Sequence, residues 1–219
     1  MLNKLLISHP APPFHPDETV ATALDLMEEW KVEHWPIVAE GVCKGLLSEE
    51  TLLDAMNSDV LSNLYNDYLP FWVNTEEHFL YALGVMTERR LTVLPVIDEA
   101  GEYVGVMMQK DLLARLAIFN GAQLPGGVVV LQVSPLDYSL GEISRLVETN
   151  DAQIQQLNTQ TDELTGMLIV TIRINKQEIS DIIATFQRYD YRIVYFAGEE
   201  QYENELRRNY HHLLHYIEM

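Results

Sequence analysis

The sequence of 219 residues lacks the features that are typical of secreted proteins, membrane-spanning proteins and proteins stabilised by a structural metal. Its single cysteine, Cys43, has no partner for an internal disulfide, and no Cys/His cluster indicates structural zinc. No apolar run approaches the roughly 18 residues that cross a bilayer. The opening stretch 1–10 is too short and too soon interrupted for a secretory signal. We therefore expect a cytoplasmic protein without a membrane partner, a cofactor or a metal site.

Basic residues are scarce as well. The sequence has 14 Lys and Arg against 33 Asp and Glu, which gives a formal net charge of −19. Affinity for DNA and RNA depends on basic side chains that neutralise phosphates, so we expect no nucleic-acid partner. The negative charge is explained by solubility. Hydrophobic residues make up 47% of the chain, which is enough for packed cores.

Signatures of catalysis are also missing. The sequence has no Gly-rich phosphate loop, nucleophile elbow or kinase signature. His211 and His215 lie four residues apart but have no third metal ligand nearby in sequence, and we interpret them as surface residues. Cys43 is expected in a turn with no evident His partner, where its thiol would be inert. We expect no enzymatic activity.

What is present is an internal repeat. Residues 73–119 predict an amphipathic helix with a buried stripe at Leu80, Leu83 and Met86, a strand at 94–97, a turn at 98–101, a return strand from Tyr103 and a helix from about Gln109. A shift of 59 residues places five residues on identical ones earlier in the chain: Ala82, Leu83, Met86, Glu88 and Pro95 on Ala23, Leu24, Met27, Glu29 and Pro36. Five identities in one gap-free register indicate a duplicated unit.

The first copy follows the same order. A proline-rich extended segment, 10–16, precedes a helix whose buried stripe is Val20, Leu24, Met27 and Trp30. Strands are expected at 35–38 and 44–47. A helix then begins at Ser48, with Glu49 and Glu50 in its first turn and three residues facing inward: Leu52, Leu53 and Met56. Residues 61–72 connect the two copies.

The last third of the chain has a different pattern. Gly121 and the run Pro125-Gly126-Gly127 indicate a linker. Beyond it we expect strands at 128–133, 151–161, 167–174 and 191–196, with helices after Ser139 and over 179–186. The buried stripe of the first helix is expected at Leu140, Ile143, Leu146 and Val147. This βαββαβ order predicts two helices on one face of a four-stranded antiparallel sheet. Residues 199–219 predict a helical tail with an apolar stripe: Leu206, Tyr210, Leu213, Leu214 and Ile217.

These residues carry a resemblance to known families. The doubled unit, with its Trp35-Pro36-Ile37-Val38 and Leu94-Pro95-Val96-Ile97 strands, each followed by a Gly-containing strand, resembles a tandem CBS-domain pair. The last third, with Asp137-Tyr138-Ser139-Leu140 at its first strand–helix junction, resembles an ACT or ACT-like domain. The whole arrangement is similar to acetoin-utilisation-type CBS proteins of bacteria. We therefore expect an α/β (α+β) fold with a CBS pair at 1–122 (repeats at 1–60 and 61–122), an ACT-like ferredoxin-like domain at 127–198 and a C-terminal helix at 199–219.

The resemblance implies a regulatory protein that senses an adenosine-containing ligand, either AMP, ADP, ATP or S-adenosylmethionine. It implies ligand-binding residues in both repeats: Trp35, Pro36, Ile37 and Ser48 in the first, and Leu94, Pro95, Val96, Lys110 and Asp111 in the second. Helix N-terminal N–H groups attract phosphate, and a carboxylate grips the ribose diol. It also implies an effector loop in the last third, made of Asp137, Tyr138, Ser139 and Leu140, although the Pro-Gly usual there is absent.

The family motif Gly-x-x-Ser/Thr-x-x-Asp is incomplete in both repeats. Repeat one has Thr51 in place of the carboxylate, and repeat two has Met108 in place of the hydroxyl. Glu49 and Glu50 also oppose a phosphate in repeat one, so the cleft of repeat two is the better candidate.

Two alternatives stay open at the level of sequence. Ser48 also fits a helix cap, and Asp111 a partner of a helix dipole. The function is then either ligand sensing or that of a ligand-free oligomerising scaffold with degenerate CBS sites. In both cases we expect a homodimer, because an ACT-like sheet has open edges and the tail has an apolar stripe. The sequence indicates no particular regulated partner.

Overall fold

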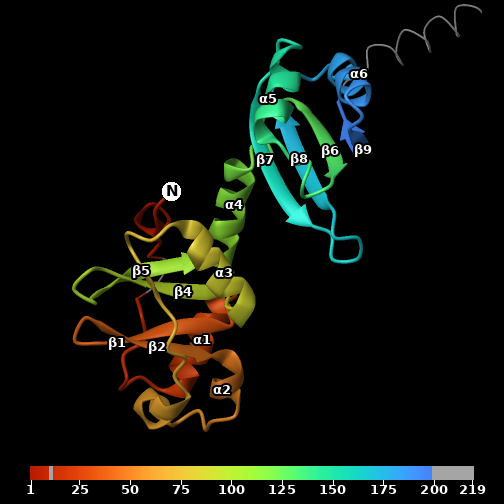
Figure 1. Cartoon of the computed structure of the whole chain (residues 1–219). Helices are drawn as coiled ribbons and strands as arrows, with labels where there is room; N and C mark the ends of the chain where they lie inside the picture. The colour runs from red at the N-terminus through yellow and green to blue at the C-terminus, as the bar shows by residue number, and fades with distance from the viewer. Residues whose placement is uncertain (10–11, 199–219) are drawn as a thin grey trace, which may run out of the picture. The chain divides into compact units, whose positions relative to one another are not determined.

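The computed structural model describes residues 1–9 and 12–198, which form two compact units (Figure 1). The first unit comprises residues 1–116, and the second begins at Ala117. The tail predicted at 199–219 lies outside the described residues. None of the helices in the described part of the chain is both long enough and apolar enough to cross a membrane.

The first unit contains the duplicated arrangement of two helices and two strands, and repeat two has one further short strand. Repeat one consists of α1 (Val20–Trp30), β1 (His34–Ala39), β2 (Val42–Ser48) and α2 (Glu49–Leu53). Repeat two consists of β3 (Val73–Asn74), α3 (Phe79–Arg89), β4 (Val93–Ile97), β5 (Tyr103–Met108) and α4 (Gln109–Phe119). Short 3₁₀ helices precede the repeats, η1 at Asn3–Leu5 and η2 at Leu61–Asp67. β1 pairs with β2, and β4 pairs with both β3 and β5.

Equivalent residues begin and end the first helix of each repeat. Thr19 caps α1 by accepting a hydrogen bond from the Thr22 N–H, and the His78 side chain caps α3. At the other end, Lys31 and Arg90 both adopt the left-handed conformation, with φ of 54° and 55°. These two positions lie 59 residues apart, so the repeat seen in sequence extends to the helix ends.

The segment that leads into each repeat crosses the other repeat first. Ser8 pairs with Val106 of β5, and further along the same segment Phe14 pairs with Ile37 of β1. In the same way Leu69 pairs with Leu46 of β2, and the short strand β3 then runs parallel to β4. The two repeats are therefore joined by exchanged backbone pairing as well as by side-chain packing.

The first unit has two hydrophobic cores, and each takes residues from both repeats. The core around α1 includes Trp35 and Ile37 but also Val93, Val106 and Met108 of repeat two. The core around α3 includes Leu94 and Val96 together with Leu46 of repeat one. Burial of this apolar surface stabilises the repeats as a pair.

Several residues that we expect to face inward are exposed. Helix α2 ends at Leu53 after one turn, so the side chains of Leu53 and Met56 are 66% and 70% exposed, and only Leu52 is buried. In α3 the buried face is that of Phe79, Ala82 and Met86, and Leu80 is 45% exposed. Cys43, expected in a turn, is buried within β2, and burial raises the pKa of its thiol.

The second unit is a four-stranded antiparallel sheet with two helices. Its elements are β6 (Gly127–Val133), α5 (Leu140–Glu148), β7 (Ile154–Thr161), β8 (Leu168–Ile174), α6 (Ser180–Arg188) and β9 (Arg192–Ala197). The strand order is β7-β8-β6-β9, and all neighbours are antiparallel. This is the order of a ferredoxin-like βαββαβ fold.

The core of the second unit lies between the sheet and its helices. Alternate residues of β6 and β8 are buried, among them Leu131 and Ile172, and they pack against Ile143, Leu146 and Phe186. The period-two burial in the strands and the helical spacing in α6 follow the sequence pattern. Leu140, expected in the buried stripe of α5, is 52% exposed because it is the first residue of the helix.

Candidate functional site

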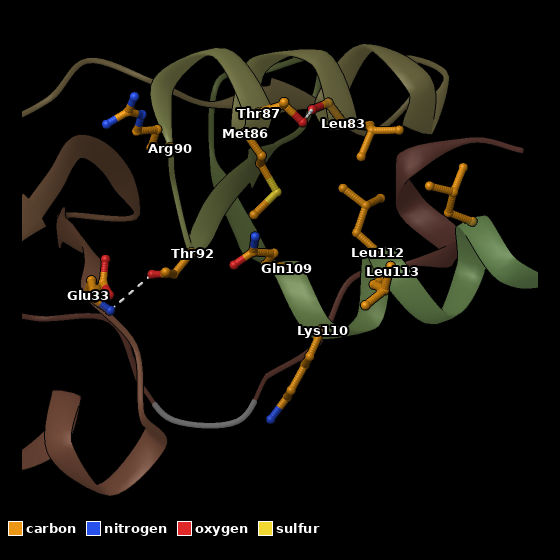
Figure 2. Close-up of a pocket in the computed structure, with 11 residues that line it drawn as sticks. Glu33, Leu83, Met86, Thr87, Arg90, Thr92, Gln109, Lys110, Leu112 and Leu113 are labelled. Carbon is orange, nitrogen blue, oxygen red and sulfur yellow. Dashed lines mark hydrogen bonds between the residues drawn. The ribbon is translucent and has the colours of Figure 1, made fainter.

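One cavity is lined mainly by residues of repeat two. It has a volume of about 610 Å³ and lies along α3 and α4 (Figure 2). Its apolar lining consists of Leu83, Met86, Leu112, Leu113 and Leu116. Its polar lining consists of Glu33, Thr87, Arg90, Thr92, Gln109 and Lys110. Cavities of this size and mixed lining are typical of small-molecule sites.

Two cations border this cavity. Arg90 lies at the C-terminal cap of α3, and Lys110 is the second residue of α4 (Figure 2). The Lys110 ammonium lies 6.0 Å from the centroid of the Trp30 ring, at the end of α1, so it reaches toward repeat one. Positive charge beside the N-terminus of α4 favours a bound anion.

A small hydrogen-bond cluster connects the repeats at the edge of the cavity. The Glu33 N–H donates to Thr92 Oγ1 at 3.0 Å, and the Thr92 N–H donates to His34 Nδ1 at 3.4 Å. Burial lowers the pKa of His34, and the carboxylate of Glu33 partly opposes this shift. In this arrangement Nδ1 of His34 accepts a hydrogen bond and therefore carries no proton.

Repeat one has a smaller cavity of opposite character. Its volume is about 360 Å³, and its lining consists of Glu33, His34, Ser48, Glu49, Glu50, Leu53 and Asp54. The Ser48 hydroxyl accepts a hydrogen bond from the Thr51 N–H at 3.1 Å and lies 2.8 Å from Thr51 Oγ1. Ser48 thus serves as the cap of α2, and the carboxylates around it repel a phosphate.

Asp111, the predicted ribose ligand, lies beside the leading segment of the chain. The Ser8 hydroxyl is 3.4 Å from Asp111 Oδ2 and 3.2 Å from the carbonyl oxygen of Val106. Its single proton serves one of these acceptors at a time, so the half-buried Asp111 keeps acceptor capacity for a ligand hydroxyl. Sequence reasoning missed Ser8, because nothing local links it to a residue 103 positions away.

The apolar residues of the predicted site lie inside the two cores. Trp35 and Ile37 are buried in one core, and Leu94 and Val96 in the other. Trp35 Nε1 donates to the carbonyl oxygen of Pro12 at 3.0 Å. Pro36 and Pro95 are also buried, in β1 and β4. Of the predicted ligand residues, Lys110 lines the larger cavity and Ser48 lines the smaller one.

The four residues of the predicted effector loop of the second unit lie in different environments. Asp137 borders a polar cavity of about 280 Å³ together with Glu142, Tyr191 and Arg192. The remaining loop residues are Tyr138, packed against the core, Ser139, whose hydroxyl caps α5, and the exposed Leu140.

One hydrogen bond stands out in this polar cavity. The Tyr191 hydroxyl donates to Glu142 Oε2 at 3.0 Å. Burial, reinforced by this hydrogen bond, raises the pKa of Tyr191 to about 12.

The geometry defines a duplicated α/β module with a cavity beside the helices of each repeat. The sequence model of the CBS domain matches residues 4–58 and 68–118. The chain therefore belongs to the CBS-domain family through a tandem pair of these domains. This confirms the pair expected from the sequence. The matched ranges cover the helices and strands of the two repeats except Phe119, the last residue of α4.

Known proteins show the same similarity. A 33.4 kDa protein in the ribosomal RNA operon of Thermofilum pendens is 25% identical over 210 residues, covering 82% of this chain and 69% of that protein. The CBS domain pair/ACT domain protein of Thermotoga maritima is 24% identical, with a TM-score of 0.49 over 54% of this chain and 98% of that one. A putative acetoin utilization protein of Vibrio cholerae is 18% identical, with a TM-score of 0.48 over 56% and 95%.

Proposed function

We propose that this chain is a non-catalytic regulatory protein that binds an adenosine-type ligand in the cleft of repeat two. CBS-domain pairs are generally regulatory rather than catalytic. The observation that carries the proposal is the contrast between the two cavities. Arg90 and Lys110 border the larger one, whereas Glu49, Glu50 and Asp54 border the smaller.

The chemistry of this cleft fits a nucleotide. Arg90 and Lys110 would attract the phosphate of a nucleotide or the carboxylate of the methionine part of S-adenosylmethionine. Asp111 follows Lys110 on α4 but does not line the cavity; it lies half-buried beside Ser8, where its carboxylate offers acceptors for a ribose diol. Glu33 also borders the cavity and opposes an anion, so the cations must lie nearer the phosphate than Glu33 does. The ligand is AMP, ADP, ATP or S-adenosylmethionine.

A thermal-shift measurement with these four compounds tests the proposal. Ligand at a hundred times its dissociation constant adds about 2.7 kcal/mol to the free energy of unfolding. For a chain of this length the midpoint should rise on the order of 5–10 °C. Asp111→Ala and Lys110→Gln should each reduce the shift. Glu50→Gln, the matched change at the equivalent position of repeat one, should leave it unchanged.

The same thermal-shift measurement distinguishes ligand sensing from the second candidate function, which is that of a ligand-free scaffold. Met108, which occupies the hydroxyl position of the motif, is buried, and Ser48 is engaged as a helix cap. These two observations favour a ligand-free oligomerising scaffold with degenerate sites. If none of the four compounds raises the melting midpoint at millimolar concentration, the result would support the scaffold and contradict ligand sensing.

We further propose that the second unit is ACT-like and that it serves self-association or a second effector. β9 is an edge strand, and its Val194, Tyr195 and Phe196 side chains are exposed. Open edges and exposed apolar side chains favour a partner. We expect a homodimer, and light scattering coupled to size exclusion measures its mass. A mass of one chain at micromolar concentration would refute self-association.

A further inference from the structure

A small apolar groove lies between the last helix and the last strand of the second unit. Its volume is about 140 Å³. Helix α6 and the edge strand β9, which form it, pack against each other (Figure 1). Six residues line the groove: Ile179, Ser180, Ile183, Ala184, Gln187 and Phe196. The volume is below the roughly 300 Å³ of small-molecule sites, so the groove suits the side chains of a docked segment rather than a free ligand.

The walls of this groove come from one face of α6 and one side chain of β9. Ser180, Ala184 and Gln187 lie three or four residues apart, so they share a face of the helix. Phe196 lies on the side of the sheet that faces the helices, because it pairs with the buried Val129. Its ring is nevertheless 43% exposed. An aromatic side chain beside the helix layer is thus left in contact with water.

The chain leaves the sheet at one end of this groove. β9 ends at Ala197, and Gly198 is the last described residue before the segment 199–219. Gly198 lies against Ile179, because a Cβ added there would be 2.9 Å from Ile179 Cγ1 and 2.5 Å from the carbonyl oxygen of Gln177. Residues 199–219 therefore start beside the groove.

The sequence of residues 199–219 supplies a matching occupant. Its apolar stripe has the spacing of one helix face: Leu206, Tyr210, Leu213, Leu214 and Ile217. The opposite face of the same predicted helix is polar: Arg207, Arg208, His211, His212, His215 and Glu218. A short helix of this kind owes most of its stability to apolar surface that covers its stripe.

We propose that residues 199–219 dock on the second unit of the same chain, with their apolar stripe over the groove between α6 and β9. The docked segment adds a third helix beside α6 and covers Phe196. The connection 199–205, at about 3.3 Å for each residue, spans up to about 23 Å. Helix α6 has 9 residues and is about 13 Å long. The connection is therefore long enough for the stripe to reach every part of the groove.

Tethering favours the same chain over a second copy. A segment joined to its groove by a short connection has an effective concentration in the millimolar range. A second copy at micromolar concentration is therefore a much weaker competitor for the groove. Docking on the helix side of β9 also leaves Tyr195 uncovered, because neighbouring residues of a strand point to opposite faces. Docking of the tail thus does not depend on the ligand or the self-association proposed above.

Hydrogen exchange of the full-length protein, followed by mass spectrometry, tests the docking. The amides of residues 206–217 should exchange at least about tenfold more slowly in the parent than in Leu213→Asp, because burial of one leucine side chain shifts the docking equilibrium by that factor. Ala184→Arg, which fills the groove and leaves the sequence of the tail unchanged, should remove the same protection. Ala184 is exposed, so its replacement should not unfold the second unit.

Two matched variants control for the added charges. His212→Asp places a carboxylate on the polar face of the predicted tail helix. Gly141→Arg places an arginine on α5, where Gly141 is exposed and has open space around it. Both variants should keep the protection of the tail. If the parent tail exchanges at the rate of an unstructured peptide, or if its protection survives Ala184→Arg, docking in this groove is overturned.

Cross-linking identifies which copy supplies the tail. In a Cys43→Ala background, Ala184→Cys and Leu213→Cys are combined in one full-length chain, which is treated with a short bismaleimide. Docking within the chain should give a cross-linked product with the mass of one chain. A product with the mass of two chains, formed also in a mixture of the two single variants, would assign the tail to a second copy. That result, or the absence of any cross-linked product, would overturn docking within the chain.

Discussion

Gly45 allows the backbones of the two repeats to approach each other. Its φ is +140°, and a Cβ added there would lie 2.7 Å from the carbonyl oxygen of Leu69 and 3.3 Å from Tyr68 Cβ. Leu69 cannot easily move away, because it exchanges two backbone hydrogen bonds with Leu46, at 2.8 and 2.9 Å. The obstacle is backbone, which cannot rotate aside as a side chain would. Gly45→Ala should therefore destabilise the first unit.

The magnitude follows from two contributions. Overpacking against a fixed neighbour costs about 1–3 kcal/mol, and a positive φ adds roughly 1 kcal/mol for a residue with a Cβ. The sum, roughly 2–4 kcal/mol, lowers the melting midpoint by about 5–15 °C in a chain of this size. Gly84→Ala is the matched control. It lies within α3 with open space around it, and it should raise stability by about 0.5–1 kcal/mol.

Circular dichroism at 222 nm, followed during heating, measures both variants against the parent. Gly41→Ala separates the two contributions, because Gly41 has φ of +77° but nothing within 4 Å of the added Cβ. It should lose only the conformational part, so its midpoint should fall between those of the other two variants. A Gly45→Ala protein that melts within about 2 °C of the parent would refute the close-approach argument.

Two further predictions concern titratable groups. Burial lowers the pKa of folded His34 below its unfolded value near 6.5, so stability should fall as the pH drops from about 6.5 through the folded pKa; His34→Gln should flatten this fall in melts between pH 5 and 7, and an unchanged slope would contradict it. Tyr191→Phe should cost about 1 kcal/mol by removing the hydrogen bond to Glu142, and it should reduce the tyrosinate absorbance change near pH 12 by the contribution of one of the 11 tyrosines. An undiminished change would contradict the raised pKa of Tyr191.

The elements could be predicted from sequence because their signals are local. Alternating apolar residues in β6 and β8, and the spacing of Ile179, Ile182 and Phe186, follow from the periods of strand and helix. The duplication likewise needed only a fixed register shift. The prediction that Leu80 lies on the buried face of α3 is wrong, because the neighbouring Phe79 is buried and Leu80 is exposed. Three-residue spacing fits two neighbouring helix faces, and only the packed fold selects one.

Long-range contacts at the site could not be predicted in this way. The family motif indicates Asp111, and charge indicates the neighbouring Lys110, but the hydroxyl beside Asp111 comes from Ser8 at the other end of the unit. The contact between Glu33 and Thr92 crosses 59 residues. No local pattern encodes such pairs, because the first arises from a leading segment that crosses to the other repeat and the second from the packing of β1 against β4. The cavity along α3 and α4 follows from the same packing.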